Sequence, residues 1–307
     1  MSSSATLPSR RFTPMEHVSN ALFVAMHAAV LLVFFIPFSW KLLALAIGSY
    51  GLRMWAVTAG YHRYFAHRSY KTSRTWQLVL AVLGATAMQN GPIWWASVHR
   101  RHHKDSDGPG DPHSPLRRGF WYAHLGWVFD RSVPKPHDES NVRDLMRYPE
   151  LRWVDRHEWV PLVGYAVACF AIGAVPGLVW GFVVSTVAVF HATMLINSLA
   201  HLWGSRRYAT PDGSRNNPLL AALTFGEGWH NNHHFCMSSA RQGFFWWEID
   251  LSYYTLKLLS WLGVVWDVRE PPASVTSRRH PSPPSARRRS RPHPRDRRMT
   301  ARVIGGA

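Results

Sequence analysis

Two short stretches of the sequence repeat one pattern of histidines. "HRRHH" places histidines at 99, 102 and 103, and "HNNHH" places them at 230, 233 and 234. Histidine accounts for 18 of 307 residues, so chance would produce H-x-x-H-H only about 0.06 times in such a sequence. In a helix, residues i, i+3 and i+4 share one face. We therefore expect the rings of each triplet to point the same way, and a bound metal ion is the simplest way to keep crowded imidazoles neutral.

Two further stretches add side chains that bind metals. "GYHRYFAH" supplies His62 and His67, and "INSLAH" supplies Asn197 and His201 on one helical face. Residues five apart lie about 140° around an α-helix, so His62 and His67 are expected to serve different metal ions or to be separated by a helix end. Nine histidines are too many for one tetrahedral zinc and suit two metal ions with four or five ligands each. Nitrogen-rich sets bind iron, zinc or copper, so spacing alone does not identify the metal.

The histidine clusters flank apolar stretches that are long enough, or nearly so, to span a bilayer. These stretches are residues 21–38, 42–59, 160–175 and 178–200. They predict two helical hairpins, the first turning at "IPFSWK" and the second at "AVPGL", where Pro176 and Gly177 break the helix. A fifth apolar run, residues 78–88, is too short to cross, and we place it at the interface or inside the cytosolic part.

This layout sets the expected orientation of the protein. Two hairpins without a fifth crossing leave residues 60–157 and everything after 201 on one side, together with the N-terminus. That side carries nearly all of the Arg and Lys, so it is predicted to be the cytoplasm. We expect an all-α integral membrane protein of the inner or cytoplasmic membrane, with four transmembrane helices in two hairpins. A cytosolic helical domain that holds the histidines caps the hairpins, and both termini face the cytoplasm.

Composition divides the sequence into a polar N-terminal segment at 1–19, a main domain at 20–270 and a disordered tail at 271–307. The tail holds ten Arg, no Lys and one Asp, and it supplies +9 of the formal charge of +17. Its prolines and self-repelling arginines disfavour folding. The expected partner surface is the lipid bilayer and not nucleic acid, because aromatic residues do not interleave the basic ones. Residues 244–263, "FFWWEIDLSYYTLKLLSWLG", predict an amphipathic helix on the bilayer surface.

These motifs resemble those of membrane fatty-acid desaturases. "HRYFAH", "HRRHH" and "HNNHH" match the three histidine boxes of that family, and the flanks "TAGYHRYFAHRSYKTSR", "GDPHSPLRRGFWYAHLGW" and "GEGWHNNHH" match as well. The sequence most resembles the acyl-CoA delta-9 (stearoyl-CoA) desaturase branch, in its bacterial form, over about residues 20–270. One departure is the Asn pair of "HNNHH", where the animal enzymes carry an aromatic residue outside the ligand positions.

The resemblance implies an enzyme that inserts a cis double bond, at carbon 9, into a long-chain fatty acyl-CoA in unsaturated fatty acid biosynthesis. It implies two iron ions (Fe²⁺) and O₂ as co-substrate, with Asn197 reaching one iron through water. The implied iron ligands are His62, His67, His99, His102, His103, His201, His230, His233 and His234. The sequence has no GxGxxG, CxxC or HPGG motif, so electrons are expected from a separate ferredoxin, cytochrome b5-like protein or reductase.

Three carboxylates lie close to the histidine boxes in the sequence. Glu227, Asp105 and Asp111 are candidates to accept the second N–H of metal-bound histidines, because such rings usually donate it to a carboxylate or a carbonyl. His27 and His191 stand alone within apolar spans, where helix packing is expected to satisfy them. We expect His124 in "YAHLGW" to have a packing role as well.

Four arginines are further candidates. Arg117, Arg118 and Arg131 lie on the cytoplasmic segment, where the phosphates of an acyl carrier could bind. Arg53 lies within the second apolar stretch, and an arginine there is functional, extends its charge to the membrane surface (snorkels) or pairs with a backbone carbonyl. The alternatives to an acyl-CoA desaturase are an acyl-lipid desaturase or another histidine-box hydroxylase. A membrane metal transporter or sensor fits less well, because its ligands would lie near the bilayer midplane.

Overall fold

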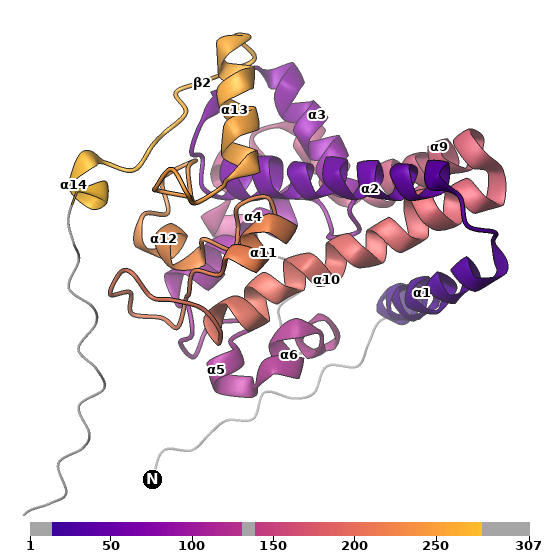
Figure 1. Ribbon diagram of the computed structural model, residues 1–307, viewed down its shortest axis with the longest axis horizontal. Coiled ribbons are helices and arrows are strands. Elements are labelled where there is room, and N and C mark those ends of the chain that lie inside the picture. The colour runs from indigo at the N-terminus through magenta and orange to yellow at the C-terminus, as the bar shows by residue number, and fades with distance from the viewer. Residues whose placement is uncertain (1–13, 131–138, 278–307) are drawn as a thin grey trace, which may run out of the picture.

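The computed structural model describes residues 14–130 and 139–277, and almost all of its regular structure is helical (Figure 1). Within these ranges the strands are β1 (Lys71–Thr72) and β2 (Val265–Trp266), which form one short antiparallel pair with Lys71 opposite Trp266. The structure therefore agrees with the predicted helical class.

Within residues 14–130 and 139–277, three helical stretches are long and apolar enough to cross a membrane, namely His17–Phe35, Trp40–Ala66 and Trp159–His201. The first two consist of α1 (Pro14–Ala29) with η1 (Val30–Phe35), and of α2 (Trp40–Trp55) with η2 (Ala56–Ala66). The third joins α9 (Trp159–Gly177), η5 (Leu178–Val184), α10 (Ser185–Ser198) and η6 (Leu199–His201). In the apolar window of the first stretch 0% of the residues are buried, as expected for side chains that face lipid.

The third stretch reverses direction near its middle. Gly173 and Ala174 leave the helical region, with Ala174 at φ 49° and ψ −142°, and the backbone then runs back from α9 into α10 (Figure 1). The arms approach closely at Gly177, where a Cβ would lie 2.5 Å from the Cys169 carbonyl oxygen. The break therefore precedes the predicted Pro176–Gly177. Pro176 instead lies in the first turn of the returning arm, where a missing N–H costs little.

The part of the protein outside the long apolar helices is built around η2 by α3 (Arg74–Ala85), α4 (Pro92–Lys104) and α8 (Pro149–Arg156). Their shared core includes Tyr61, Phe65, Leu80, Ile93 and Leu151, each at most 1% exposed. The short apolar run predicted at 78–88 forms much of α3 and packs in this core, and it is not one of the three candidate spans. Its apolar residues thus serve protein packing.

Short helices complete the described part of the protein. They are α5 (Pro115–Arg118), α6 (Phe120–His124), η3 (Gly126–Phe129), η4 (Glu139–Asn141), α7 (Arg143–Met146), α11 (Pro218–Leu223), α12 (His230–Phe235), α13 (Leu251–Trp261) and α14 (Ala273–Thr276). The helix predicted at 244–263 begins only at Leu251, because Asp250 caps it by accepting the Tyr253 N–H at 3.0 Å. Trp246 and Trp261 are 81% and 78% exposed, as expected at a bilayer surface.

The predicted disordered tail contains an ordered beginning. Helix α14 lies within 271–307, and the Tyr208 hydroxyl donates to the Val275 carbonyl oxygen at 3.2 Å. Residues 278–307 of the tail and residues 1–13 of the predicted N-terminal segment lie outside the described residues.

Candidate metal centre and acyl cavities

All nine predicted histidines gather at one place, in two adjacent groups. Within each group the candidate ligand atoms lie within 4.8 Å of one another. The five-histidine group contains His62, His67, His99, His103 and His233. The four-histidine group contains His102, His201, His230 and His234. Each H-x-x-H-H triplet therefore contributes to both groups.

Helix geometry explains this division. On α4, His99 and His103 are four residues apart, about 40° around the axis, whereas His102 lies about 100° from His103. On α12, His230 and His234 form the equivalent close pair, and they join the other group. The expectation that each triplet points one way is thus too coarse, because neighbouring residues on the helix face different metal positions.

The helix end expected between His62 and His67 is present, since η2 ends at Ala66 and His67 is its C-cap. The expectation that the two histidines serve different metal ions is wrong, because both belong to the five-histidine group, with ring centroids 4.7 Å apart. The reason is that η2 (Ala56–Ala66) is a π-helix, in which hydrogen bonds join residues five apart. The backbone N–H of His67 donates to the His62 carbonyl oxygen at 3.1 Å. An i, i+5 pair lies in line on such a helix.

Four of the nine rings contact a carboxylate through Nδ1. Two of these carboxylates are ones that the sequence predicted. Glu227 lies 2.5 Å from His62 Nδ1, and Asp111 lies 3.0 Å from His102 Nδ1. The other two, Asp107 and Asp212, were not predicted. His201 donates to Asp107 and His234 donates to Asp212, each at 2.8 Å. Asp105 is placed differently from its prediction. Among the described residues its carboxylate accepts the Gly110 N–H and no histidine N–H, so it holds the loop after α4.

The titration of these carboxylates favours their ionised form. Burial acts to raise the pKa of Asp107, but hydrogen bonds from His201 and Ser114 outweigh it and leave the pKa at about 2. Burial likewise opposes ionisation of Asp212, and the bond with His234 again makes the net shift of its pKa a lowering. Each carboxylate therefore holds the proton of its ring on Nδ1, so that the lone pair is on Nε2.

The arrangement of the Nε2 atoms tests whether metal ions fit. His201 Nε2 lies 3.0 Å from His230 Nε2, and His67 Nε2 lies 2.9 Å from His99 Nε2. Lone pairs facing at this distance repel one another unless a cation lies between them. Nitrogens about 2.1 Å from a shared ion and at right angles to each other lie about 3.0 Å apart. The residues present therefore fit two metal ions.

Burial also keeps several of these imidazole rings neutral, which favours metal binding. Burial first, and then the neighbouring imidazoles, holds the pKa of His99, His103, His230 and His233 well below the usual range of histidine. His234 Nε2 is buried without a hydrogen-bond partner among the described residues. Neutral imidazoles with free nitrogens are the form in which histidine binds metals.

The two asparagines of "HNNHH" position the missed carboxylate. Both are 0% exposed. Asn231 accepts the backbone N–H of Tyr208 at 2.8 Å and donates to the Tyr208 carbonyl oxygen at 3.1 Å. Asn232 accepts from the Asn216 side chain at 2.7 Å. Together they bind both sides of the loop that carries Asp212 to His234, which gives the departure from an aromatic residue a structural reason.

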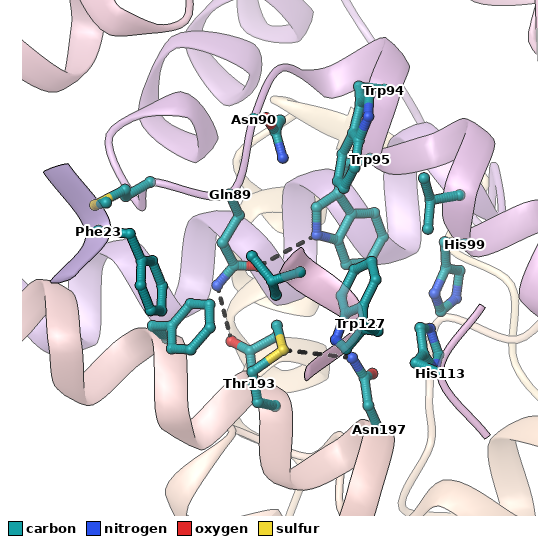
Figure 2. A pocket seen from close by; sticks show the side chains of 15 residues that line it. Phe23, Gln89, Asn90, Trp94, Trp95, His99, His113, Trp127, Thr193 and Asn197 are labelled. Carbon is teal, nitrogen blue, oxygen red and sulfur yellow. Dashed lines mark hydrogen bonds between the residues drawn. The ribbon is translucent and has the colours of Figure 1, made fainter. Parts of the chain in front are cut away.

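Two apolar cavities adjoin the histidine groups. The first holds about 110 Å³ and runs from Phe23 of α1 to His99 and Trp127 (Figure 2). The second holds about 40 Å³ and extends beside both groups toward Met54. Trp95, His99, Thr193 and Asn197 line both cavities. Asn197, predicted to act through water, thus lies where the cavities meet the histidines.

A hydrogen-bonded bridge holds the walls at this junction (Figure 2). The Gln89 amide donates to the Thr193 hydroxyl at 3.0 Å and accepts from Trp95 Nε1 at 3.2 Å. Trp95 in turn stacks on His99 with ring centroids 4.8 Å apart. The bridge ties α4 and α10 together beside the five-histidine group. Sequence reasoning did not find it, because Thr193 lies 104 residues after Gln89 and the three residues belong to no motif.

Two of the three arginines predicted to bind an acyl carrier lie at a surface hollow of about 170 Å³. Arg117, Arg118 and the unpredicted Arg101 line it. Arg118 also pairs with Asp130 at 2.6 Å. Arg131, the third predicted arginine, lies outside the described residues.

Histidines beyond the nine take other positions. His113 lies beside His102 and Asp111 and lines the first cavity. His124 Nε2 and His191 Nδ1 share a hydrogen bond of 3.0 Å, and this contact joins α6 to α10. The packing roles predicted for His124 and His191 are consistent with these contacts.

Comparison with known proteins identifies the family to which these histidine motifs belong. The model of the fatty acid desaturase family matches residues 38–262. The chain is 39% identical over 265 residues (85% of this chain, 71% of the relative) to a palmitoyl-monogalactosyldiacylglycerol delta-7 desaturase of Arabidopsis thaliana. It is 40% identical over 237 residues (76% of each) to an acyl-CoA C20 delta-5 desaturase of Anemone leveillei. It is 38% identical over 264 residues (85% of each) to a delta-9 acyl-lipid desaturase of Arabidopsis thaliana.

These relatives fit a membrane protein with histidine clusters that could bind metal ions and with helices long enough to cross a bilayer. Their names include both acyl-CoA and acyl-lipid substrates. This chain belongs to the fatty acid desaturase family.

Proposed function

We propose that this protein is an O₂-dependent desaturase that inserts a cis double bond at carbon 9 of a long-chain fatty acyl group. The observation that carries the proposal is the junction of the two apolar cavities with the two histidine groups at His99 and Asn197. An extended hydrocarbon tail in these cavities would pass the metal positions with its middle carbons.

The metal ions are proposed to be iron. The C–H bonds in the middle of an acyl group have no useful acidity, so a redox metal must supply an oxidant made from O₂, which zinc does not. One iron would be held by the five-histidine group, and the other by the four-histidine group with Asn197 acting through water. The protein's own contribution is to fix both positions, to align the acyl group beside them and to keep water out.

We infer an acyl-CoA as the first candidate substrate. Arg101, Arg117 and Arg118 line a hollow that suits the phosphates of a CoA head group. Asp111 and Ser114 line the same hollow, whereas His113 between them lines the first acyl cavity. One short segment therefore separates the candidate position of the head group from that of the acyl tail.

An acyl-lipid substrate is the second candidate, and a specific observation favours it. The first cavity reaches Phe23, which belongs to the outermost apolar stretch, His17–Phe35. An acyl group that is still part of a membrane lipid could enter from that side without leaving the bilayer.

The proposed arrangement in the membrane has four crossings. Two are the stretches His17–Phe35 and Trp40–Ala66, and two are the arms on either side of Gly173–Ala174. Both termini and the histidines would then face the cytoplasm. Electrons would come from a separate cytosolic donor, because the acyl group supplies only two of the four that reduce O₂ to water.

The decisive test is expression in a host that lacks desaturases, followed by location of new double bonds in its fatty acids. We expect a cis bond at carbon 9 of a C16 or C18 fatty acid. The variant His230→Ala should abolish it, and His157→Ala, a histidine outside both groups, should not. Purified protein in nanodiscs, supplied with either acyl-CoA or phospholipid, separates the two carriers. Unchanged lipids despite full iron loading and a working donor would contradict the proposal.

A further inference from the structure

A third hollow lies at the end of η2, beside β1, α7 and β2. It holds about 560 Å³ and shares no lining residue with the two acyl cavities. We call it the basic cleft. Its aromatic lining residues are Tyr64, Tyr70, Tyr148 and Trp266, and its cationic ones are Arg68, Lys71, Arg147 and Arg269.

The cleft has a net positive charge. Its two carboxylates are already paired, Asp144 with Arg100 at 2.7 Å and Asp267 with Lys71 at 2.7 Å. Arg147 and Arg269 are exposed and have no carboxylate partner among the described residues. Such unpaired cations attract an acidic partner and steer its approach.

The floor of the cleft leads directly to the five-histidine group. Arg68 follows His67 and Arg100 follows His99 in the sequence, and both arginines contact Asp144, at 3.5 Å and 2.7 Å. Arg100 also donates to the carbonyl oxygen of Ala66 at 3.0 Å. The Nε2 atoms of the two histidines lie 2.9 Å apart. The lining residue Arg68 is thus one residue away from His67, and the lining residue Asp144 contacts Arg100, which is one residue away from His99.

We propose that the basic cleft is the docking site of a small acidic electron-transfer protein of the ferredoxin class. This inference rests on the proposed function. In that reaction R–CH₂–CH₂–R′ + O₂ + 2 H⁺ + 2 e⁻ gives R–CH=CH–R′ + 2 H₂O. The two electrons come from two reduced donor molecules, each oxidised by one electron. Docking in the cleft brings the donor to His67 and His99 without blocking the acyl cavities.

The test is binding of a plant-type [2Fe–2S] ferredoxin to the full-length protein in nanodiscs of neutral phospholipid. The variant Arg147→Glu/Arg269→Glu reverses two exposed charges of the cleft. The matched control Arg152→Glu/Arg156→Glu reverses two exposed charges on α8, outside the cleft. We expect the cleft variant to raise the Kd for ferredoxin about tenfold and to weaken its salt dependence. The control should change Kd less than about twofold, because its two charges lie outside the cleft. Every variant keeps the same basic tail, so the tail does not contribute to the difference.

A second measurement keeps this inference separate from the proposed function. Protein reduced chemically and then mixed with O₂ and acyl substrate needs no donor, so the cleft variant should form product in a single turnover as the unmodified protein does. Absence of product from the unmodified protein would count against the proposed function, whereas the Kd comparison stands by itself. Equal Kd values for the two double variants would overturn the docking site. Weakened binding of coenzyme A, with ferredoxin binding unchanged, would overturn it too, because the cleft would then hold a substrate head group.

Discussion

The backbone N–H of His67 donates to the carbonyl oxygen of His62 across 3.1 Å. This bond between residues five apart closes the π-helix η2 and brings the two rings to 4.7 Å in one group. π-helical turns are rare and often lie at functional sites. Here the wider turn converts an offset that suits no α-helical face into a shared metal position.

The first prediction concerns the independence of the two groups. The double variant His62→Ala/His67→Ala removes two ligands of one group, and it should retain about one iron per protein molecule. The variant His62→Ala/His230→Ala damages both groups and should retain almost none. Both should be inactive. Iron content of the purified proteins, measured by mass spectrometry, checks this. If the two variants lost equal amounts of iron, the groups would not be separate sites.

The π-helix also marks a limit of sequence reasoning. Apolar runs and helix breakers predicted the helical stretches, because these patterns are local. The pitch of η2 depends on contacts with residues far away in the sequence. For example, a Cβ at Gly84 would lie 2.1 Å from the ring of Tyr61, so that α3 packs against η2 only where a glycine admits the ring. Nothing between Ala56 and Ala66 distinguishes that segment from an α-helix by composition.

The second prediction concerns the carboxylates that hold the histidine rings. Asp212→Asn should lower iron affinity by about 10- to 100-fold, because an amide no longer fixes the proton on Nδ1 of His234. Asp105→Asn is the matched control, since its side-chain oxygen can still accept the Gly110 N–H. Iron retained during titration with a chelator is the readout. Equal loss of iron from both variants would show that the Asp212 contact has no special part in metal binding.

Sequence distance explains which carboxylates were found. Asp111 and Glu227 lie a few residues from a histidine box, so proximity in the sequence pointed to them. Asp212 lies 22 residues before His234 and reaches it because Asn231 binds Tyr208, on the N-terminal side of the loop that carries Asp212. The sequence did not distinguish Asp107 from Asp105, because both follow the same histidine box closely. Only the conformation of the loop decides which of the two faces His201.

The third prediction concerns the buried guanidinium of Arg53, which is 0% exposed. It donates to the Thr186 hydroxyl at 2.5 Å and to the carbonyl oxygen of Thr86, the C-cap of α3, at 3.2 Å. Arg53→Met removes this link between α2, α3 and α10, and it should destabilise the protein by about 2 kcal/mol, a typical value for charged hydrogen bonds. Iron content of the folded protein should not change.

Thermal unfolding in detergent checks this prediction. Arg53→Lys keeps the charge but not the planar fork, so its stability should be intermediate. If Arg53→Met were as stable as the unmodified protein, the cost of burying the cation would equal or exceed the gain from its hydrogen bonds.

The last prediction concerns the bridge of Gln89, Trp95 and Thr193, which fixes the cavity walls beside His99. Thr193→Val keeps the side-chain shape and removes the hydroxyl, so the amide of Gln89 loses its acceptor and the wall can shift. A shift on the order of 1 Å changes which methylene lies beside the metal positions. We therefore expect a mixture of double-bond positions and about a tenfold lower turnover. Gas chromatography with mass spectrometry of derivatised products measures both effects. Thr255→Val, whose hydroxyl accepts from Trp55 at 2.6 Å outside the cavities, is the control. A single unchanged product from Thr193→Val would mean that the apolar walls alone set the position of the double bond.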